Sequence, residues 1–394
     1  MTNPESASPT VAVIGDGQLA RMMQTEAIEL GIHLRLLAGA KDSSAAQVIP
    51  DVELGDYTNL DDLHRTVAGA DAVTFDHEHV PTEHLRTLID EGLNVQPGPE
   101  ALVNAQDKLV MRKKLREIGA PIPAFFGIES AEQAGEFWDA VSGEVCLKAT
   151  RGGYDGHGVW FPDSKAELQE LVVKLLDEGV PLMAERKVAF SRELSAMVAR
   201  NASGEVRAWP VVESVQKNGI CVEAIAPAPD LSENLADYCQ DLAKRIASEL
   251  GVTGVLAVEL FEHLDEAGQP AVSVNELAMR PHNTGHWTQD GCVTSQFEQH
   301  LRAVLDWPLG STDQSAPTTV MANVLGADTD PDMPMHERVR AVMERYPQVK
   351  VHLYGKTWRA GRKIGHVNVT GQDPTETCNI ARAAAHYLVT ATWV

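Results

Sequence analysis

Short apolar runs alternate with helical segments at the start of the chain, and this alternation constrains the fold more than any other feature. Val11–Ile14, Leu34–Leu37 and Ala72–Phe75 are such runs, and a glycine turn at 15–17 leads from the first run into a helical segment. Apolar strands that alternate with helices are typical of a doubly wound parallel sheet. We therefore predict an N-terminal α/β domain over residues 1–100.

A different pattern begins near residue 100. Apolar, β-branched runs now follow one another with fewer helices between them, which indicates an α+β body. We predict a central domain over residues 101–308, with a lid over about 120–187, and a small β-rich domain over 309–394. The predicted strands of the central domain are Val145–Ala149, Leu182–Glu185, Leu194–Ala199, Gly254–Phe261 and Ala271–Leu277.

The charge of the chain narrows the choice of partners. Lys and Arg number 33 against 56 Asp and Glu, a formal net charge of -23. Such a surface repels nucleic acid and anionic membranes, so we expect neither as a partner. Five scattered cysteines without C-x-x-C spacing indicate free thiols, and no apolar stretch approaches the roughly 20 residues that span a bilayer. We predict a cytoplasmic protein.

A glycine-dense loop follows a lysine at the end of a predicted strand. Lys148 precedes four glycines, the last of which is Gly158. Glycines let backbone N–H groups approach phosphate oxygens, and a lysine neutralises those oxygens. An ordinary hairpin turn is the alternative, but the lysine favours a phosphate-binding loop. The Walker motif is absent from the sequence.

The glycine turn at 15–17 lacks the third glycine of a dinucleotide fingerprint. A turn from strand to helix still presents N–H groups to an anion, so Gly17, Gln18 and Leu19 are candidates for binding a substrate phosphate. A turn that serves only packing explains these residues equally well.

Two glutamates interrupt predicted apolar strands. Glu259 follows Val-Leu-Ala-Val, and Glu276 follows Val-Ser-Val-Asn. Carboxylates in such strands are costly to bury unless they are paired or bind a metal. Two carboxylates on neighbouring strands suit Mg²⁺, which completes its coordination with nucleotide phosphates. Structural salt bridges are the alternative.

Polar and basic side chains gather in two further segments. The loop after Glu276 carries donors suited to an anionic substrate, although its histidines, taken singly, are more often structural. A basic cluster near the C-terminus stands out in an acidic chain and indicates an anion pocket, with a solvated loop as the alternative. The residues concerned are Arg280, His282, Asn283, Thr284 and His286 in the loop, and Lys356, Arg359, Arg362 and Lys363 in the cluster.

These motifs, in this order, resemble the ATP-grasp ligases over nearly the whole chain. Within that superfamily, four segments resemble the 5-(carboxyamino)imidazole ribonucleotide synthases. They are Gly15-x-Gly-Gln-Leu19, the Gly-Gly-Tyr-Asp-Gly loop, Arg280-x-His-Asn-x-Gly-His-Trp287 and Gly361-Arg-Lys-x-Gly-His-x-Asn368. Three departures are His157, where the family usually has Arg or Lys, Gln216, where a histidine is familiar, and Ala20, where glycine is common.

The resemblance implies a set of site residues. Those expected to bind ATP are Lys108, Lys148, Gly153, Tyr154, Gly156, His157, Gly158, Val159, Glu185, Arg186, Lys187, Val188, Glu193, Gln216, Asn275 and Glu276. Glu259 and Glu276 would hold Mg²⁺, with Mn²⁺ as the alternative ion. Aminoimidazole ribonucleotide would lie among Gln18, Leu19, Glu78, Tyr154, Asp155, Arg280, His282, Lys356, Arg362 and Lys363. Of these, Asp155, Arg280, His282 and Lys356 are the candidates for a catalytic role.

The resemblance also implies the reaction. ATP would phosphorylate bicarbonate, and the exocyclic amine of aminoimidazole ribonucleotide would capture the released CO2, in a protein that forms a homodimer. Two alternatives remain at this point. One is a formate-dependent glycinamide ribonucleotide transformylase on the same scaffold, and the other is a module that binds nucleotide without turnover.

Overall fold

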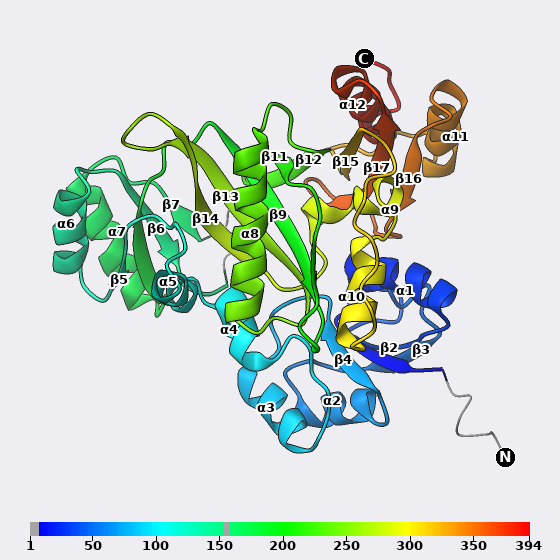
Figure 1. Cartoon of the computed structure of the whole chain (residues 1–394), viewed down its shortest axis with the longest axis horizontal. Coiled ribbons are helices and arrows are strands. Elements are labelled where there is room, and N and C mark those ends of the chain that lie inside the picture. The colour runs from blue at the N-terminus through cyan, green and yellow to red at the C-terminus, as the bar shows by residue number, and fades with distance from the viewer. Residues whose placement is uncertain (1–7, 153–157) are drawn as a thin grey trace.

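The computed structural model describes residues 8–152 and 158–394. Its N-terminal part is a four-stranded parallel sheet, drawn in blue in Figure 1, which confirms the predicted α/β domain. The elements are β1 (Thr10–Ile14), α1 (Gln18–Leu30), β2 (His33–Ala38), β3 (Asp51–Leu54), α2 (Leu60–Val67), β4 (Ala72–Phe75) and α3 (Thr82–Asp90). The strand order is β3-β2-β1-β4, so β1 lies inside the sheet, and its Val11–Ile14 run is fully buried.

Two helices lead into a second, antiparallel sheet. They are α4 (Pro99–Gln106) and α5 (Lys108–Glu117), and the Asp107 carboxylate caps α5 by accepting hydrogen bonds from Leu109 N and Val110 N at 3.0 and 3.1 Å. The sheet has the order β5-β8-β6-β7 and lies in the segment for which we predict a lid, so we keep that name for it. The lid elements are β5 (Phe125–Ile128), α6 (Ala131–Ala140), β6 (Val145–Ala149), β7 (Val159–Trp160), α7 (Lys165–Asp177) and β8 (Leu182–Arg186).

The largest sheet is the centre of the molecule (Figure 1). Its strands are long because β-branched and other apolar residues continue through them, and α8 covers one face. Its first half and the connected helices are β9 (Arg192–Arg200), β10 (Val206–Ala208), β11 (Val212–Lys217), β12 (Ile220–Ala226), α8 (Glu233–Glu249), β13 (Gly254–Leu264), β14 (Pro270–Ala278), η2 (Asn283–Gly285), α9 (Thr288–Gly291) and α10 (Gln296–Val304).

The C-terminal segment extends this same sheet. Its elements are β15 (Thr318–Leu325), α11 (Met335–Arg345), β16 (Lys350–Leu353), β17 (Lys363–Gly371) and α12 (Pro374–Thr390). Strand β15 pairs antiparallel with β12 from Glu223↔Ala322 to Ala226↔Thr319, so the sheet continues across the boundary predicted at residue 308. The order is β14-β13-β9-β11-β12-β15-β17-β16, with β10 on β9.

Buried contacts join these parts into one body. A single apolar core runs from β1 and β4 to β9, β13 and α8. The Ser44 hydroxyl donates to Tyr354 O at 2.6 Å, which ties the N-terminal sheet to the C-terminal segment. None of the helices in the described ranges has the length and apolar character needed to cross a bilayer.

Candidate active site

The two predicted carboxylates lie opposite each other on adjacent strands. Glu259 on β13 and Glu276 on β14 are register partners, next to an irregularity in the pairing. Burial, followed by the negative charges of Glu276 and Glu193, raises the pKa of Glu259 to about 8. His282 Nε2 lies 3.3 Å from Glu259 Oε1. The positive charges of Lys108 and Lys363 oppose this rise in pKa but do not cancel it, so a bound cation would stabilise the two carboxylates further.

Two lysines from different elements contact Glu276 or the neighbouring Asn275. Lys108, the first residue of α5, contacts Glu276. Lys148 on β6 lies 2.7 Å from Glu185 and 3.4 Å from Asn275 Oδ1. Both lysine side chains are about nine-tenths buried, so they are held rather than freely solvated.

Glu185 is held by a buried arginine that the sequence reasoning missed. Arg112 is fully buried on α5, contacts Glu185 and donates to Asn275 O at 2.8 Å. Burial alone would raise the pKa of Glu185, but Lys148 and Arg112 outweigh it and lower the pKa to about 2. The helical spacing of Arg112, four residues after Lys108, was the available signal.

A cavity of about 670 Å³ lies between the lid and the central sheet, a size typical of ligand sites. Aromatic rings that the sequence reasoning did not single out form part of it: Phe190 and Phe261 stack with centroids 4.5 Å apart. Burial raises the pKa of Glu193 in its wall to about 7. The predicted ATP-binding residues that line it are Lys108, Lys148, Val159, Glu185, Arg186, Lys187, Val188, Glu193, Gln216, Asn275 and Glu276. We call this space the nucleotide cavity.

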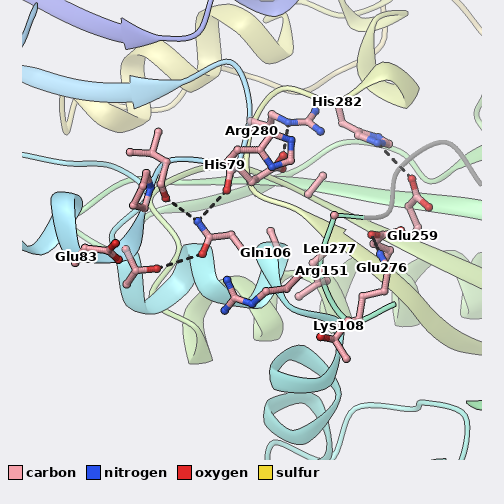
Figure 2. Close-up of a pocket in the computed structure, with 18 residues that line it drawn as sticks. His79, Glu83, Gln106, Lys108, Arg151, Glu259, Glu276, Leu277, Arg280 and His282 are labelled. Carbon is pink, nitrogen blue, oxygen red and sulfur yellow. Dashed lines mark hydrogen bonds and ion pairs between the residues drawn. The ribbon is translucent and has the colours of Figure 1, made fainter. Parts of the chain in front are cut away.

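A second cavity, of about 470 Å³, lies on the other side of the carboxylates (Figure 2). We call it the substrate cavity. Glu78 reaches it from the N-terminal domain and pairs with Arg280 at 2.8 Å, while its other oxygen accepts from Met279 N at 3.3 Å. Lys108, Glu259, Glu276 and His282 line both cavities, so these four residues form the wall between them.

Gln106 holds the Glu78 segment in place. Its side-chain amide donates to Glu78 O at 2.8 Å and to Val80 O at 3.0 Å, and its oxygen accepts from the Thr82 hydroxyl at 3.3 Å (Figure 2). Sequence reasoning missed Gln106, because nothing in the pattern of the chain links it to Glu78.

The predicted basic cluster is divided in the structure. Lys363 lines the nucleotide cavity, whereas Lys356 contacts Gln18 of α1 and neither Lys356 nor Arg362 lines the two cavities. Burial lowers the pKa of Lys356. Arg362 donates to the Thr357 hydroxyl at 2.7 Å. Lys356 and Gln18 thus form a polar contact between the N-terminal and C-terminal segments, separate from the wall of the two cavities.

The start of α1 differs from the simple anion site that the turn suggests. The Asp76 carboxylate accepts hydrogen bonds from Gly17 N at 2.6 Å and from Ala20 N at 2.9 Å. An acidic side chain therefore already occupies part of this helix end, and the Leu19 side chain is buried. Asp76 was missed, although a charged residue directly after a buried strand was a usable signal.

The remaining predicted residues fall into two groups. Gly158 lies directly before β7, where its carbonyl accepts from Ala149 N at 2.9 Å. The predictions for Gly153, Tyr154, Asp155, Gly156 and His157 lie outside the described residues.

Known proteins match the chain over its full length. Residues 9–106 match the ribonucleotide synthetase preATP-grasp domain, 113–297 the ATP-grasp domain, and 319–379 the phosphoribosylaminoimidazole carboxylase C-terminal domain. The N5-carboxyaminoimidazole ribonucleotide synthase of Corynebacterium ammoniagenes is 63% identical over 99% of this chain and 95% of its own. The chain belongs to the N5-carboxyaminoimidazole ribonucleotide synthase family.

Membership in the N5-carboxyaminoimidazole ribonucleotide synthases confirms the family that the loops resemble and excludes the transformylase and the non-catalytic module. The protein is an ATP-grasp ligase that carboxylates aminoimidazole ribonucleotide with ATP in de novo purine biosynthesis.

Two solved structures of the family from Aspergillus clavatus share the fold. One is a complex with ATP (30% identity, TM-score 0.86) and the other a complex with ADP and 5-aminoimidazole ribonucleotide (29% identity, TM-score 0.86). Each match covers 97% of this chain and 98% of the other.

Proposed function

We propose that this synthase phosphorylates bicarbonate in the nucleotide cavity and delivers the activated carbon to the amine of aminoimidazole ribonucleotide in the substrate cavity. The observation that carries this proposal is the shared wall. Lys108, Glu259, Glu276 and His282 line both cavities, so phosphoryl transfer and amine capture take place on two sides of the same four side chains.

The nucleotide cavity suits ATP. Lys108 and Lys148 would contact the phosphates, Glu185, Lys187 and Val188 would border the adenine, and Glu193 would bind the ribose. The stacked Phe190 and Phe261 rings add an apolar surface to the same space. The ATP complex of the Aspergillus clavatus relative supports this assignment.

The donors at the wall fit Mg²⁺. Two cross-strand carboxylates and the neighbouring Asn275 amide supply hard oxygen ligands. The raised pKa of Glu259 reflects its burial and the nearby negative charges, and a cation would offset both. In the described ranges, no group of three or more His, Cys, Asp or Glu side chains is placed to hold a metal by itself. This agrees with an ion held jointly by two glutamates and nucleotide phosphates. When bound, Mg²⁺ would neutralise charge on the transferring phosphoryl group.

The substrate cavity would hold the aminoimidazole ring near Arg280, Glu78 and His282, and the ribose phosphate would extend toward the contact between Lys356 and Gln18. Arg362 lies on the same segment as Lys356. The Aspergillus clavatus complex with 5-aminoimidazole ribonucleotide supports such a site.

The proposed reaction has three steps. A bicarbonate oxygen attacks the γ-phosphorus of ATP and ADP leaves, giving carboxyphosphate. Its C–O bond then breaks to give CO2 and phosphate. The exocyclic nitrogen bonds to the CO2 carbon and loses a proton, for which Asp155 is our candidate acceptor. Lys108 and Lys148 would stabilise the charge that moves onto the ADP oxygens, and a closed lid would exclude water.

An isotope experiment tests the proposal. Bicarbonate labelled with ¹⁸O should transfer one labelled oxygen to each inorganic phosphate, because the attacking oxygen stays on phosphorus when carboxyphosphate breaks down. ADP release should require both bicarbonate and aminoimidazole ribonucleotide, and formate with glycinamide ribonucleotide should not replace them. Phosphate without label, formed at the normal rate, would show that bicarbonate is not phosphorylated.

We also propose a cytoplasmic homodimer. Ile28 and Val293 are exposed apolar side chains on segments that a 2.8 Å hydrogen bond from the Ser295 hydroxyl to Glu26 holds together. Light scattering at micromolar concentration measures the mass of the particle, and a monomer would contradict the proposal.

A further inference from the structure

A fully buried amide lies directly behind the wall of the two cavities. Gln296, the first residue of α10, has no exposed surface. Its side-chain oxygen accepts from His282 N at 2.7 Å, and its nitrogen donates to His282 O at 2.9 Å. The amide therefore binds both polar groups of the His282 backbone. Its nitrogen also contacts His286 Nδ1 at 2.9 Å.

These contacts leave Gln296 a single orientation. A backbone N–H can only donate and a carbonyl can only accept, so the amide oxygen and nitrogen cannot exchange places. Both amide hydrogens are used, one on His282 O and one on His286 Nδ1. The amide also packs closely on the loop, where only glycine fits at position 285, because a Cβ there would lie 2.5 Å from the Gln296 oxygen. The His282 backbone is thus fixed from behind by one side chain.

The His282 ring points toward the wall that the two cavities share. Its Nε2 lies 3.3 Å from Glu259 (Figure 2), and its Nδ1 lies 2.8 Å from the Thr284 hydroxyl, which in turn lies 2.9 Å from the Ser195 hydroxyl. A shift of the His282 backbone would move the ring away from the wall that both cavities share. Positioning errors of this kind reduce turnover even when no reacting group is removed.

We infer that Gln296 is a positioning residue of the carboxylation reaction, which acts by fixing the backbone of His282 so that its imidazole faces Glu259 and the substrate. The inference rests on the proposed role of His282 at the substrate. Gln296 itself lines neither cavity.

The same helix offers a matched control. Gln299 is also fully buried, and its amide binds Gly310 in the same way, accepting from Gly310 N at 2.7 Å and donating to Gly310 O at 2.9 Å. Neither Gln299 nor Gly310 lines the nucleotide cavity or the substrate cavity. Gln299→Met removes one such paired contact with little change in volume, and Gln296→Met removes the equivalent pair together with the contact to His286, so the Gln296 variant should lower the melting temperature somewhat more.

The full-length enzyme is assayed for ADP release at saturating bicarbonate. Gln296→Met should lower kcat roughly 10-fold and change the KM for ATP less than about 2-fold, whereas Gln299→Met should keep kcat within about 2-fold of the unmodified enzyme. In the His282→Ala background, Gln296→Met should have almost no further effect on kcat, because the group through which it acts is gone.

Two results overturn the inference and can be told apart. If His282→Ala retains normal turnover, the proposed role of His282 fails and the inference fails with it. If His282→Ala is impaired but Gln296→Met matches Gln299→Met, or lowers kcat equally with and without His282, only the role of Gln296 fails. Gln296→Asn, which keeps an amide but shortens the side chain by one methylene, is made alongside. If the methionine variant does not fold, the same comparisons of kcat are made with Gln296→Asn.

Discussion

The nucleotide cavity and the substrate cavity share a wall but are built differently. The nucleotide cavity takes its polar residues mainly from the lid sheet and the central sheet, where the pairing of the strands fixes their positions. The substrate cavity takes Glu78 from the N-terminal domain and Arg280 from a loop, and side-chain amides such as Gln106 hold the segments together. Strand pairing thus orders the first cavity, whereas individual polar contacts order the second.

This difference has a mechanistic consequence. A residue on a paired strand keeps its place when one neighbour is changed, because many backbone hydrogen bonds hold it. A residue on a loop that is held by one side-chain amide loses its position when that amide is removed. We therefore expect remote substitutions to disturb the substrate side more than the nucleotide side, and the predictions below test this comparison.

The largest effect is expected at the shared wall. Glu276→Ala should lower ATP turnover by at least roughly 10³-fold, because a metal ion supplies several kcal/mol to phosphoryl transfer and one of its two proposed carboxylates is lost. ADP release at saturating Mg²⁺ measures this, and an unchanged circular dichroism spectrum checks the fold. Near-normal turnover would remove Glu276 from the metal site.

A large effect on stability is expected on the nucleotide side. Arg112→Met leaves the buried Glu185 carboxylate with Lys148 as its remaining cationic partner, and breaking a buried pair typically costs about 3–5 kcal/mol. Urea unfolding measures the loss. The KM for ATP should rise while that for aminoimidazole ribonucleotide stays nearly constant. If both constants rise equally, the two cavities are not independent.

An opposite pattern is expected on the substrate side. Arg280→Ala and Lys356→Ala should each raise the KM for aminoimidazole ribonucleotide about 10- to 100-fold, as expected when a charged hydrogen bond worth roughly 1.5–3 kcal/mol is lost. Arg280→Ala should also lower kcat. Steady-state kinetics with each substrate varied in turn gives both constants. A matching rise in the KM for ATP would contradict the proposed division.

The smallest effect is a pH-dependent loss of stability at a contact between the N-terminal and central domains. His300 Nε2 lies 2.7 Å from the Thr74 hydroxyl on β4, Val255 N of β13 donates to its Nδ1 at 3.1 Å, and burial lowers its pKa to about 3. The unfolded chain binds a proton below about pH 6.5 and the folded chain does not, so stability falls as the pH drops from 6.5 toward 3.

Between pH 6.5 and 5.5, His300 should account for about 1 kcal/mol of lost unfolding free energy. Urea titrations at both pH values measure it, with His300→Gln as the comparison, since glutamine does not titrate. An equal pH dependence in the two proteins would show that His300 is protonated in the fold or that other groups dominate.

The sequence predicted the features that depend on periodicity and motif. The parallel sheet, the strands of the central domain and the placement of Glu259 beside Glu276 follow from apolar runs and the residues that interrupt them. Arg112, Gln106 and Gln296 were missed because each acts through a contact distant in sequence, from 14 residues for Gln296 with His282 to 73 for Arg112 with Glu185. Side chains that bind backbone groups carry no pattern that shows which segment they will meet.

The antiparallel ladder between β12 and β15 limits how this enzyme can be recombined with its relatives. A chimera joined near residue 308 would keep β12 from one parent and take β15 from the other, so the new junction would divide a hydrogen-bonded strand pair. If the grafted strand did not pair in register, the edge of β12 would expose backbone N–H and C=O groups to neighbouring molecules, and the hybrid would tend to aggregate. Because β9 also pairs with β11 and β13, successful grafts should carry the whole sheet from β9 onward, with the crossover placed in the connection between β8 and β9.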